Sequence, residues 1–269
     1  MTVYFIGAGP GAADLITVRG AEILGRCRTC LVAGSLVPPE LLRLCPPDAT
    51  VVDTARMPLS EIVEHIVAAD HSGHDVARLH SGDPSIYSAL TEQRRELHSR
   101  SIDTEIVPGV PAFAAAAAAL DTELTVPGLG QSLLITRVST LSTDMPPGEE
   151  LSRLAATGVT LALHLAAHRT DDIVAALTPH YGSDCPTATV AFASRPNERI
   201  VRCALADLPA ALADADIRRT AVIFVGRVLD PDNGPTTDSY LYSQARMTKL
   251  RTASGHADAG TGSAEHPRT

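Results

Sequence analysis

The chain contains 269 residues, enough for one large domain or two modest ones. Its formal net charge of −9 disfavours non-specific binding to nucleic acid or to an anionic membrane surface. Aromatic residues make up only 3% of the sequence and tryptophan is absent, so Ala, Leu, Val and Ile must build the core. This composition is typical of parallel sheets covered by helices.

The sequence carries no sign of a membrane span, a secretion signal or a metal site. No window reaches the ~18 apolar residues that a membrane span needs, and no basic segment precedes the first strand. We therefore expect a cytoplasmic protein. Cys27 and Cys30 form a C-x-x-C pair, but no second pair at ligand spacing accompanies them. We expect both to be small core residues and the protein to bind no metal.

Strands alternate with helices through the first half of the chain. Ser60 is a favourable N-cap for one of these helices. The expected strands cover residues 3–6, 30–33, 51–52, 75–79 and 104–107. The expected helices cover residues 14–24, 40–44, 61–71, 87–100 and 112–120. This alternation predicts a mainly parallel sheet.

A link at residues 126–130 separates this half from a second series of elements. The expected strands there cover residues 132–136, 160–165, 187–192, 199–203 and 221–225. The expected helices cover residues 149–156, 170–179 and 206–213. The strand at 199–203 resembles a hairpin partner, so this half should form a mixed sheet. We predict two α/β domains, at 1–125 and 131–230, and a flexible tail at 231–269.

The first glycine-rich turn superficially fits a dinucleotide fingerprint. Residues 7–12 follow the pattern G-x-G-x-x-A between a strand and a helix. Pro10, however, has no backbone N–H to offer to a pyrophosphate. The second apolar run, residues 30–36, lacks the acidic residue that would hold a ribose. A dinucleotide-dependent oxidoreductase is therefore a weaker alternative, and a non-catalytic binding protein is another.

Turns that contain glycine or proline follow several of the expected strands. They lie at residues 7–11, 34–35, 80–85 and 108–112. Ligands of open α/β sheets bind at the carboxyl ends of the strands, so these turns predict a cleft. The alternative is that strand–helix loops simply need Gly and Pro for their geometry.

Residues 80–85 form the most informative of these turns. Gly82 would let a ligand approach the backbone, and Asp83 would accept hydrogen bonds from a ligand or serve as a helix N-cap. His80 is a candidate proton carrier, although a lone histidine at a strand end is more often a hydrogen-bonding residue. Ser85 has no histidine and aspartate at recognisable spacing, which argues against a serine nucleophile.

Segments that occur in the same order along residues 3–229 resemble the tetrapyrrole methylase family. They read VYFIGAGPGAADLITVRG (3–20), LVAGSLV (31–37), RLHSGDPSIYSA (78–89), EIVPGVPAFAAAAAAL (105–120), LHLAAHR (163–169) and AVIFVGRVL (221–229). The AGSLV and SGDPSIY stretches are similar to the branch that methylates carbon 11 of precorrin-4, giving precorrin-5, in cobalamin synthesis. A methylase of this fold that acts on another precorrin carbon, or on uroporphyrinogen, is the alternative.

This resemblance implies two α/β domains that enclose a cleft, the N-terminal one with a mainly parallel sheet and the C-terminal one with a mixed sheet. It implies a homodimer and the methyl donor S-adenosyl-L-methionine, released as S-adenosyl-L-homocysteine. It also implies an acidic tetrapyrrole substrate, precorrin-4 or cobalt-precorrin-4. The cofactor contacts of the family fall on Pro10, Gly82, Asp83, Ile86, Pro111, Ala112, Leu165, Ala193, Thr220 and Ala221.

Two further sets of residues complete the predicted site. His80 and Asp83 are candidates to assist proton loss from the substrate or to hold it in the correct tautomer. Because guanidinium groups bind carboxylates in a bidentate manner, arginines are candidate anchors for the carboxylates of a precorrin. The candidates are Arg19, Arg56, Arg137 and Arg169. Relatives often continue the strand at 133–137 with Gly-Arg-Thr-Pro, whereas this chain keeps Arg137 and lacks the basic residue that follows.

Overall fold

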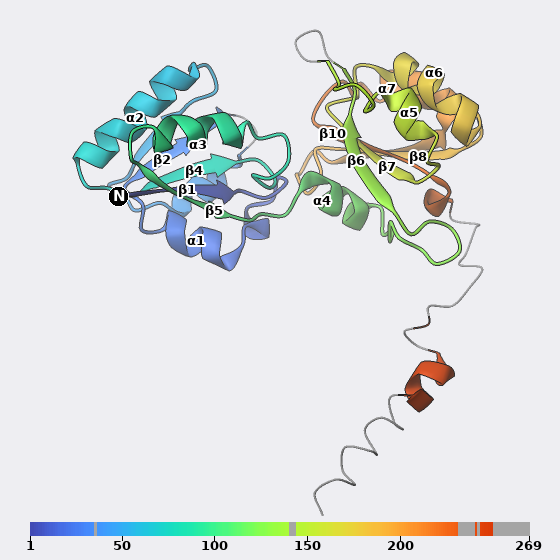
Figure 1. Cartoon of the computed structure of the whole chain (residues 1–269), viewed down its shortest axis with the longest axis horizontal. Helices are drawn as coiled ribbons and strands as arrows, with labels where there is room; N and C mark the ends of the chain where they lie inside the picture. The colour runs from blue at the N-terminus through green and yellow to red at the C-terminus, as the bar shows by residue number, and fades with distance from the viewer. Residues whose placement is uncertain (35–36, 140–143, 231–239, 241–242, 250–269) are drawn as a thin grey trace, which may run out of the picture.

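The computed structural model describes residues 1–34, 37–139, 144–230, 240 and 243–249. It contains two five-stranded sheets, one from each half of the chain, and helices pack on both (Figure 1). The predicted class, two α/β domains of which the second has a mixed sheet, is confirmed. The predicted tail at 231–269 lies outside the described residues, apart from residue 240 and residues 243–249.

The first sheet is parallel and has the strand order β3-β2-β4-β1-β5. Its strands are β1 (Thr2–Gly7), β2 (Thr29–Val32), β3 (Thr50–Asp53), β4 (Val76–His80) and β5 (Asp103–Val107). The connecting helices are α1 (Val18–Leu24), the 3-10 helix η3 (Pro39–Leu44), α2 (Leu59–His71) and α3 (Leu90–His98). Because β4, β1 and β5 are parallel neighbours, their carboxyl ends and the loops that follow lie side by side.

Alternation along β1 explains why this sheet is buried on both faces. Tyr4 and Ile6 pack in one apolar cluster with Leu24 of α1. Val3 and Phe5 pack in a second cluster, which includes residues of α2 and α3. Successive residues of a strand point to opposite faces, so helices are needed on both sides of the sheet.

The C-x-x-C pair belongs to this core. Cys27 and Cys30 are fully buried in the cluster that contains Tyr4 and Ile6. Burial raises the pKa of the Cys27 thiol to about 12, so it remains protonated at neutral pH. Cys27 and Cys30 are small core residues, as the sequence predicted.

Two helices of the first domain begin at other residues than the sequence predicted. α1 begins at Val18 because Thr17 caps it, with Thr17 Oγ1 accepting a hydrogen bond from Gly20 N at 3.1 Å. α2 begins at Leu59, so Ser60 lies within the helix and is not its N-cap. A side-chain cap thus marks the start of α1, whereas α2 follows Pro58 without a side-chain cap.

The loop before α3 is longer than predicted. α3 begins at Leu90, and not at residue 87. Tyr87 and Ala89 have positive φ angles of 52° and 53°. A left-handed residue cannot be part of a right-handed helix, so the segment between β4 and α3 remains a loop at the carboxyl end of the sheet.

The second sheet has the order β6-β7-β10-β8-β9. Its strands are β6 (Leu133–Arg137), β7 (Thr160–His164), β8 (Pro186–Ala191), β9 (Arg199–Ala204) and β10 (Ala221–Val225). β6 pairs with β7 in parallel, whereas the other neighbours are antiparallel. The associated helices are α5 (Leu151–Ala155), α6 (Thr170–Tyr181) and α7 (Leu208–Asp214). The predicted hairpin of β8 and β9 is confirmed.

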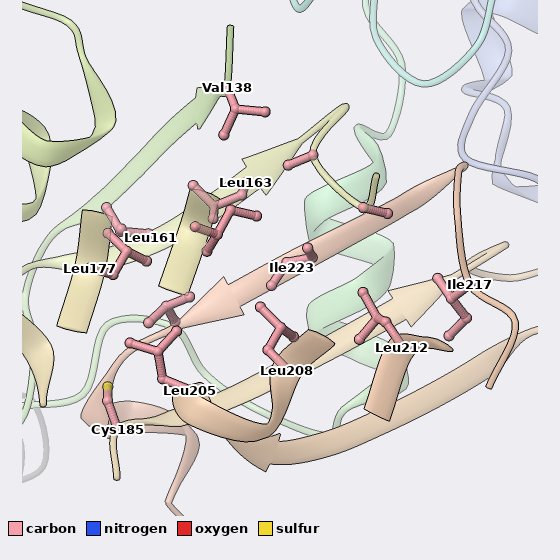
Figure 2. Packing of buried hydrophobic residues seen from close by; sticks show 14 of the residues in the cluster. Val138, Leu161, Leu163, Leu177, Cys185, Leu205, Leu208, Leu212, Ile217 and Ile223 are labelled. Carbon is pink, nitrogen blue, oxygen red and sulfur yellow. The ribbon is translucent and has the colours of Figure 1, made fainter. Parts of the chain in front are cut away.

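One face of the second sheet is covered by α5, α6 and α7. Figure 2 shows Leu161 and Leu163 of β7 and Ile223 of β10 in the same apolar cluster as Leu177 of α6 and Leu208 of α7. All of these side chains are fully buried. This cluster is the main core of the second domain, and it leaves the opposite face of the sheet for other contacts.

Helix α4 (Ala112–Ala119) packs on that opposite face (Figure 1). Its Ala115 and Ala116 lie in one cluster with Val222 and Phe224 of β10. The short alanine side chains let the helix approach the sheet closely. The range 1–125 predicted for the first domain therefore includes a helix that packs on the second sheet.

Backbone packs directly on backbone where β1, β4 and β5 end. A Cβ atom added at Gly7 would lie 2.5 Å from Gly109 Cα and 2.8 Å from Gly82 O, closer than real Cβ atoms approach. Gly82 N also donates a hydrogen bond to Gly9 O at 2.7 Å. Glycine is required at such close approaches, so these residues hold three predicted turns together as one surface.

We expect Gly7→Ala to lower the free energy of unfolding by about 1–3 kcal/mol, because the added methyl must displace the Gly109 backbone. Chemical denaturation followed by circular dichroism measures this change. Gly25→Ala is the matched control, since an added Cβ there would lie 3.4 Å from its nearest neighbour. Equal losses of stability in the two variants would contradict the role assigned to Gly7.

Candidate active site

A cleft with a volume of about 850 Å³ lies between the two domains. Loops after β1, β4 and β5 contribute Pro10, Gly82 and Pro111, and the second domain contributes Leu165 and Thr220. The volume lies within the range of about 300–1,000 Å³ that is typical of small-molecule sites. A ligand bound there contacts loops of both domains.

Every residue predicted as a cofactor contact lines this cleft. These residues are Pro10, Gly82, Asp83, Ile86, Pro111, Ala112, Leu165, Ala193, Thr220 and Ala221. Three of them are alanines, whose small side chains leave space for a flat ligand group. The fold thus brings together positions that are as far apart in the sequence as Pro10 and Ala221.

A row of paired residues crosses the second sheet along the cleft. Arg137 of β6 pairs with His164 of β7, which pairs in turn with Val222 of β10. Val222 pairs with Val190 of β8. All four residues line the cleft, because paired residues on neighbouring strands project from the same face of a sheet. The row combines an apolar surface with a cation and an imidazole.

Several lining residues have strained backbone conformations. Tyr87, Ala89, Leu165 and Thr220 have φ angles between 52° and 54°, a region that non-glycine residues rarely occupy. Such conformations cost about 1–3 kcal/mol each and cluster at binding sites. Leu165 is also 57% exposed, although it is apolar. Strain and an exposed apolar side chain on the same wall both indicate a surface built to hold a ligand.

Asp83 lines the cleft and also braces its loop. Asp83 Oδ2 accepts a hydrogen bond from Gly109 N at 2.7 Å, and Asp83 Oδ1 accepts one from Ser85 N at 2.8 Å. Burial alone would raise the pKa of Asp83, but its hydrogen bonds with Ser85 and Gly109 outweigh this effect and lower it. Asp83 is therefore a carboxylate that joins the β4 loop to the β5 loop.

His80 lies inside the first domain and not among the residues that line the cleft. Its side chain is buried, with its ring centroid 5.6 Å from that of Phe5. Burial and, secondly, the charge of Arg78 lower the pKa of His80 to about 3. His80 is neutral at neutral pH and is shielded from the cleft, so a direct role in proton transfer finds no support in its position.

The predicted arginine anchors divide into two groups. Arg137 lines the cleft, and its guanidinium donates hydrogen bonds to the carbonyl oxygens of Val138 at 3.1 Å and Asp144 at 3.2 Å. The other candidates lie outside the lining: Arg19, Arg56 and Arg169.

Sequence reasoning missed two arginines that do line the cleft. Arg218 and Arg219 lie in the turn before β10, and Arg218 pairs with Asp216 at 3.2 Å. Their adjacency to the predicted contacts Thr220 and Ala221 was the available signal. The arginines predicted as anchors lie in other segments of the chain.

The two domains also touch beside the first glycine-rich turn. Ala12 N donates a hydrogen bond to Ser194 Oγ at 3.0 Å. A Cβ atom added at Gly11 would lie 2.5 Å from Arg195 Cγ. Ser194 and Arg195 follow Ala193 of the cleft, so this contact joins the first turn to the second domain beside the cleft.

Residues 2–209 match the family described as Tetrapyrrole (Corrin/Porphyrin) Methylases. The chain belongs to this family. The matched range includes the turns after β1, β4 and β5 and most of the second sheet. The family predicted from the sequence is thereby confirmed.

Several of its relatives carry the name of the predicted branch. A precorrin-4 C(11)-methyltransferase of Mycobacterium tuberculosis is 61% identical over 91% of this chain and 98% of its own length. The precorrin-4 C(11)-methyltransferase of Rhodococcus erythropolis is 58% identical over 91% of this chain and 98% of its own length. A cobalt-precorrin-4 C(11)-methyltransferase of Methanocaldococcus jannaschii is 41% identical over 85% of this chain and 88% of its own.

Solved structures share the whole architecture. A cobalt precorrin-4 methyltransferase superposes with a TM-score of 0.83 at 39% identity, covering 86% of this chain and 96% of its own. A uroporphyrin-III C-methyltransferase of Thermus thermophilus, solved with S-adenosylhomocysteine, superposes with a TM-score of 0.71 at 25% identity. That superposition covers 88% of this chain and 98% of the other.

The position of His80 predicts a pH dependence of stability. Its folded-state pKa of about 3 lies below the value of about 6.5 for an unfolded histidine, so the unfolded state binds the proton first. Stability should therefore fall as the pH drops from about 6.5, by up to about 1.4 kcal/mol per pH unit from this residue. His80→Leu should flatten the dependence in urea denaturation between pH 7 and 5. An unchanged slope in His80→Leu, relative to the exposed-site control His71→Leu, would contradict this account.

Proposed function

We propose that this protein transfers a methyl group from S-adenosyl-L-methionine to carbon 11 of precorrin-4, giving precorrin-5, in cobalamin biosynthesis. The observation that carries the proposal is that all the cofactor positions of the family line one cleft between the domains. The names of relatives at 61% and 58% identity support precorrin-4 as the substrate. The structural neighbour solved with S-adenosylhomocysteine supports the cofactor.

The residues of the cleft fit this cofactor. Ala112, Ala193 and Ala221 leave space for an adenine ring, and Ile86 and Leu165 offer apolar contacts. When bound, the cofactor supplies a methyl group activated by a positively charged sulfur. Pro10 has no N–H, but a cofactor held by the other loops does not require one there.

The chain contributes to the reaction by positioning and by excluding water. Holding two reactants in line can contribute about 7–11 kcal/mol to lowering the barrier. Val190, Val222 and Leu165 form an apolar wall that keeps water from the reacting groups. With the charged methyl donor bound, a cleft poor in water would favour a transition state in which that charge is dispersed.

Arginines on the second domain are suited to anchor the carboxylates of the substrate. Arg137, Arg218 and Arg219 all line the cleft, whereas Asp83 is the only carboxylate among the described residues that line it. Asp83 is already occupied by hydrogen bonds from the β5 loop and from its own loop. A macrocycle rich in carboxylates would therefore place its acidic side chains toward these arginines and its ring toward the methyl donor.

The relatives favour the metal-free substrate over the cobalt-bearing one. Identity is 61% to the Mycobacterium tuberculosis precorrin-4 enzyme and 41% to the Methanocaldococcus jannaschii cobalt-precorrin-4 enzyme. The cobalt ion takes the place of inner ring N–H protons and leaves the identity of the methylated carbon unchanged, so both substrates belong in the assay.

Organisation and compartment complete the proposal. We propose that the chain has two domains, at 1–125 and 131–230. We also propose that two copies of the chain form a homodimer in the cytoplasm. All five cysteines are free, in keeping with a reducing compartment. Within the described part of the chain, we find no helix whose length and apolar character would let it cross a bilayer.

The function is tested by ligand binding and by product formation. We expect isothermal titration calorimetry to detect binding of S-adenosyl-L-homocysteine and none of NADH. We expect mass spectrometry to detect a product 14 mass units heavier than precorrin-4, the mass of an added CH₂. Binding of NADH alone would favour an oxidoreductase. Methylation of uroporphyrinogen in place of precorrin-4 would move the protein to another branch of the family.

Arg219→Ala and Arg137→Ala should each raise the KM for precorrin-4 by about tenfold or more, because a charge-assisted hydrogen bond to a carboxylate is lost. The Kd for S-adenosyl-L-homocysteine should change by less than about twofold. Arg28→Ala is the control, since Arg28 is exposed and pairs with Asp48 away from the cleft. Equal weakening of cofactor and substrate binding would remove the role of either arginine as an anchor.

A further inference from the structure

We propose that His164 contacts the tetrapyrrole directly, and that its Nε2 atom accepts a hydrogen bond from a ring N–H and so fixes the tautomer that is methylated. This inference rests on the proposed function, because it names a substrate-contacting residue for that reaction. It assigns to His164 a role that the sequence motifs had given to His80 or Asp83.

His164 lies at the point of the cleft where an anchored macrocycle would be held. It is the last residue of β7, and its neighbours in register are Arg137 on β6 and Val222 on β10. All three line the cleft. A tetrapyrrole whose peripheral carboxylate reaches Arg137 therefore brings its ring nitrogens toward the adjacent imidazole.

The Nε2 atom of His164 is buried, and none of the described residues forms a hydrogen bond with it. Buried polar atoms without a partner are rare in folded proteins and need an explanation. His80 Nε2 is a second such atom, but only His164 lines the cleft. The rings of Tyr87 and Phe113 pack around the imidazole, at centroid distances of 5.7 Å and 6.5 Å. Packing against these rings fixes the position of the imidazole and leaves its Nε2 atom for a ligand.

The Tyr87 ring packs against the imidazole that carries this atom. Tyr87 belongs to the loop of the first domain before α3, and its side chain is 46% exposed. Its φ of 52° is strained for a residue with a side chain. A half-exposed residue in a strained loop is displaced more readily than a core residue, so the entering macrocycle replaces the Tyr87 ring against His164.

The charge state of His164 suits an acceptor. Burial lowers its pKa to about 4, so the imidazole is neutral at neutral pH. A neutral imidazole has one acceptor nitrogen, whereas an imidazolium has none. A neutral residue also avoids repulsion with the positively charged sulfur of the methyl donor.

The test compares His164→Leu with His164→Gln, whose amide oxygen can still accept a hydrogen bond. We expect the Leu variant to lower kcat for precorrin-4 at least tenfold and to leave the Kd for S-adenosyl-L-homocysteine within twofold. Its Tm should rise by about 2–4 °C, because a buried polar atom without a partner has been removed. The Gln variant should recover at least part of kcat, and the exposed-site control His71→Leu should match the wild type.

A second measurement uses the wild-type protein, so it does not depend on how the variants fold. In ¹⁵N spectra of histidine-labelled protein, the His164 resonance should shift when precorrin-4 is added to the S-adenosyl-L-homocysteine complex. S-adenosyl-L-homocysteine alone should leave it largely unchanged.

The outcomes separate this inference from the proposed function. If the wild type is active, two results would overturn the inference and leave the function standing. One is a His164→Leu variant that is equally active, and the other is a His164 resonance that does not shift when the substrate is added. A lower Tm together with lost activity in both His164 variants would assign a purely structural role and would also overturn it. A wild type that methylates no precorrin would instead remove the proposed function.

Discussion

The cleft depends on direct backbone contact between three loops of the first sheet. Gly7 and Gly109 lie so close to each other and to Gly82 O that neither has room for a Cβ atom. Asp83 strengthens the same junction through its hydrogen bond from Gly109 N at 2.7 Å. These loops follow neighbouring parallel strands, so the contact between them places Pro10 and the other ligand-facing residues on one surface. A side chain at Gly7 would separate the loops and alter the shape of the site.

The second domain supplies the opposite wall through a different physical device. Its sheet is mixed, so strands of either direction carry residues to the same edge. The register then aligns Arg137, His164 and Val222 across three strands, which combines charge, a neutral imidazole and an apolar surface in one row. Left-handed residues such as Leu165 and Thr220 turn the chain beside this row. The strain in these residues is offset by the packed core on the other face of the sheet.

Sequence reasoning located the residues that act through local motifs. Gly82, Asp83 and Pro111 belong to turns that can be recognised from glycine and proline spacing. Among the residues that strand register places in the cleft, it selected Arg137 but not His164. Arg19, Arg56 and Arg169 were selected by residue type and lie outside the cleft, whereas Arg219 and His164 line it. Both of these adjoin predicted contacts, Arg219 beside Thr220 and His164 beside Leu165, but the register of β7 and β10 and the turn before β10 decide that they also face the cleft.

Apolar alternation, glycine spacing and the order of the segments were enough to establish the two α/β domains, the family and the turns of the first sheet. Each of these is a local property of the chain, set by side-chain period and backbone freedom. Three features arise only in the folded molecule. They are the start of α3 at Leu90, after the loop that contains Tyr87, the packing of α4 on the second sheet and the neutral state of His164. They depend on contacts between residues far apart in the chain and on burial, which a linear pattern does not contain.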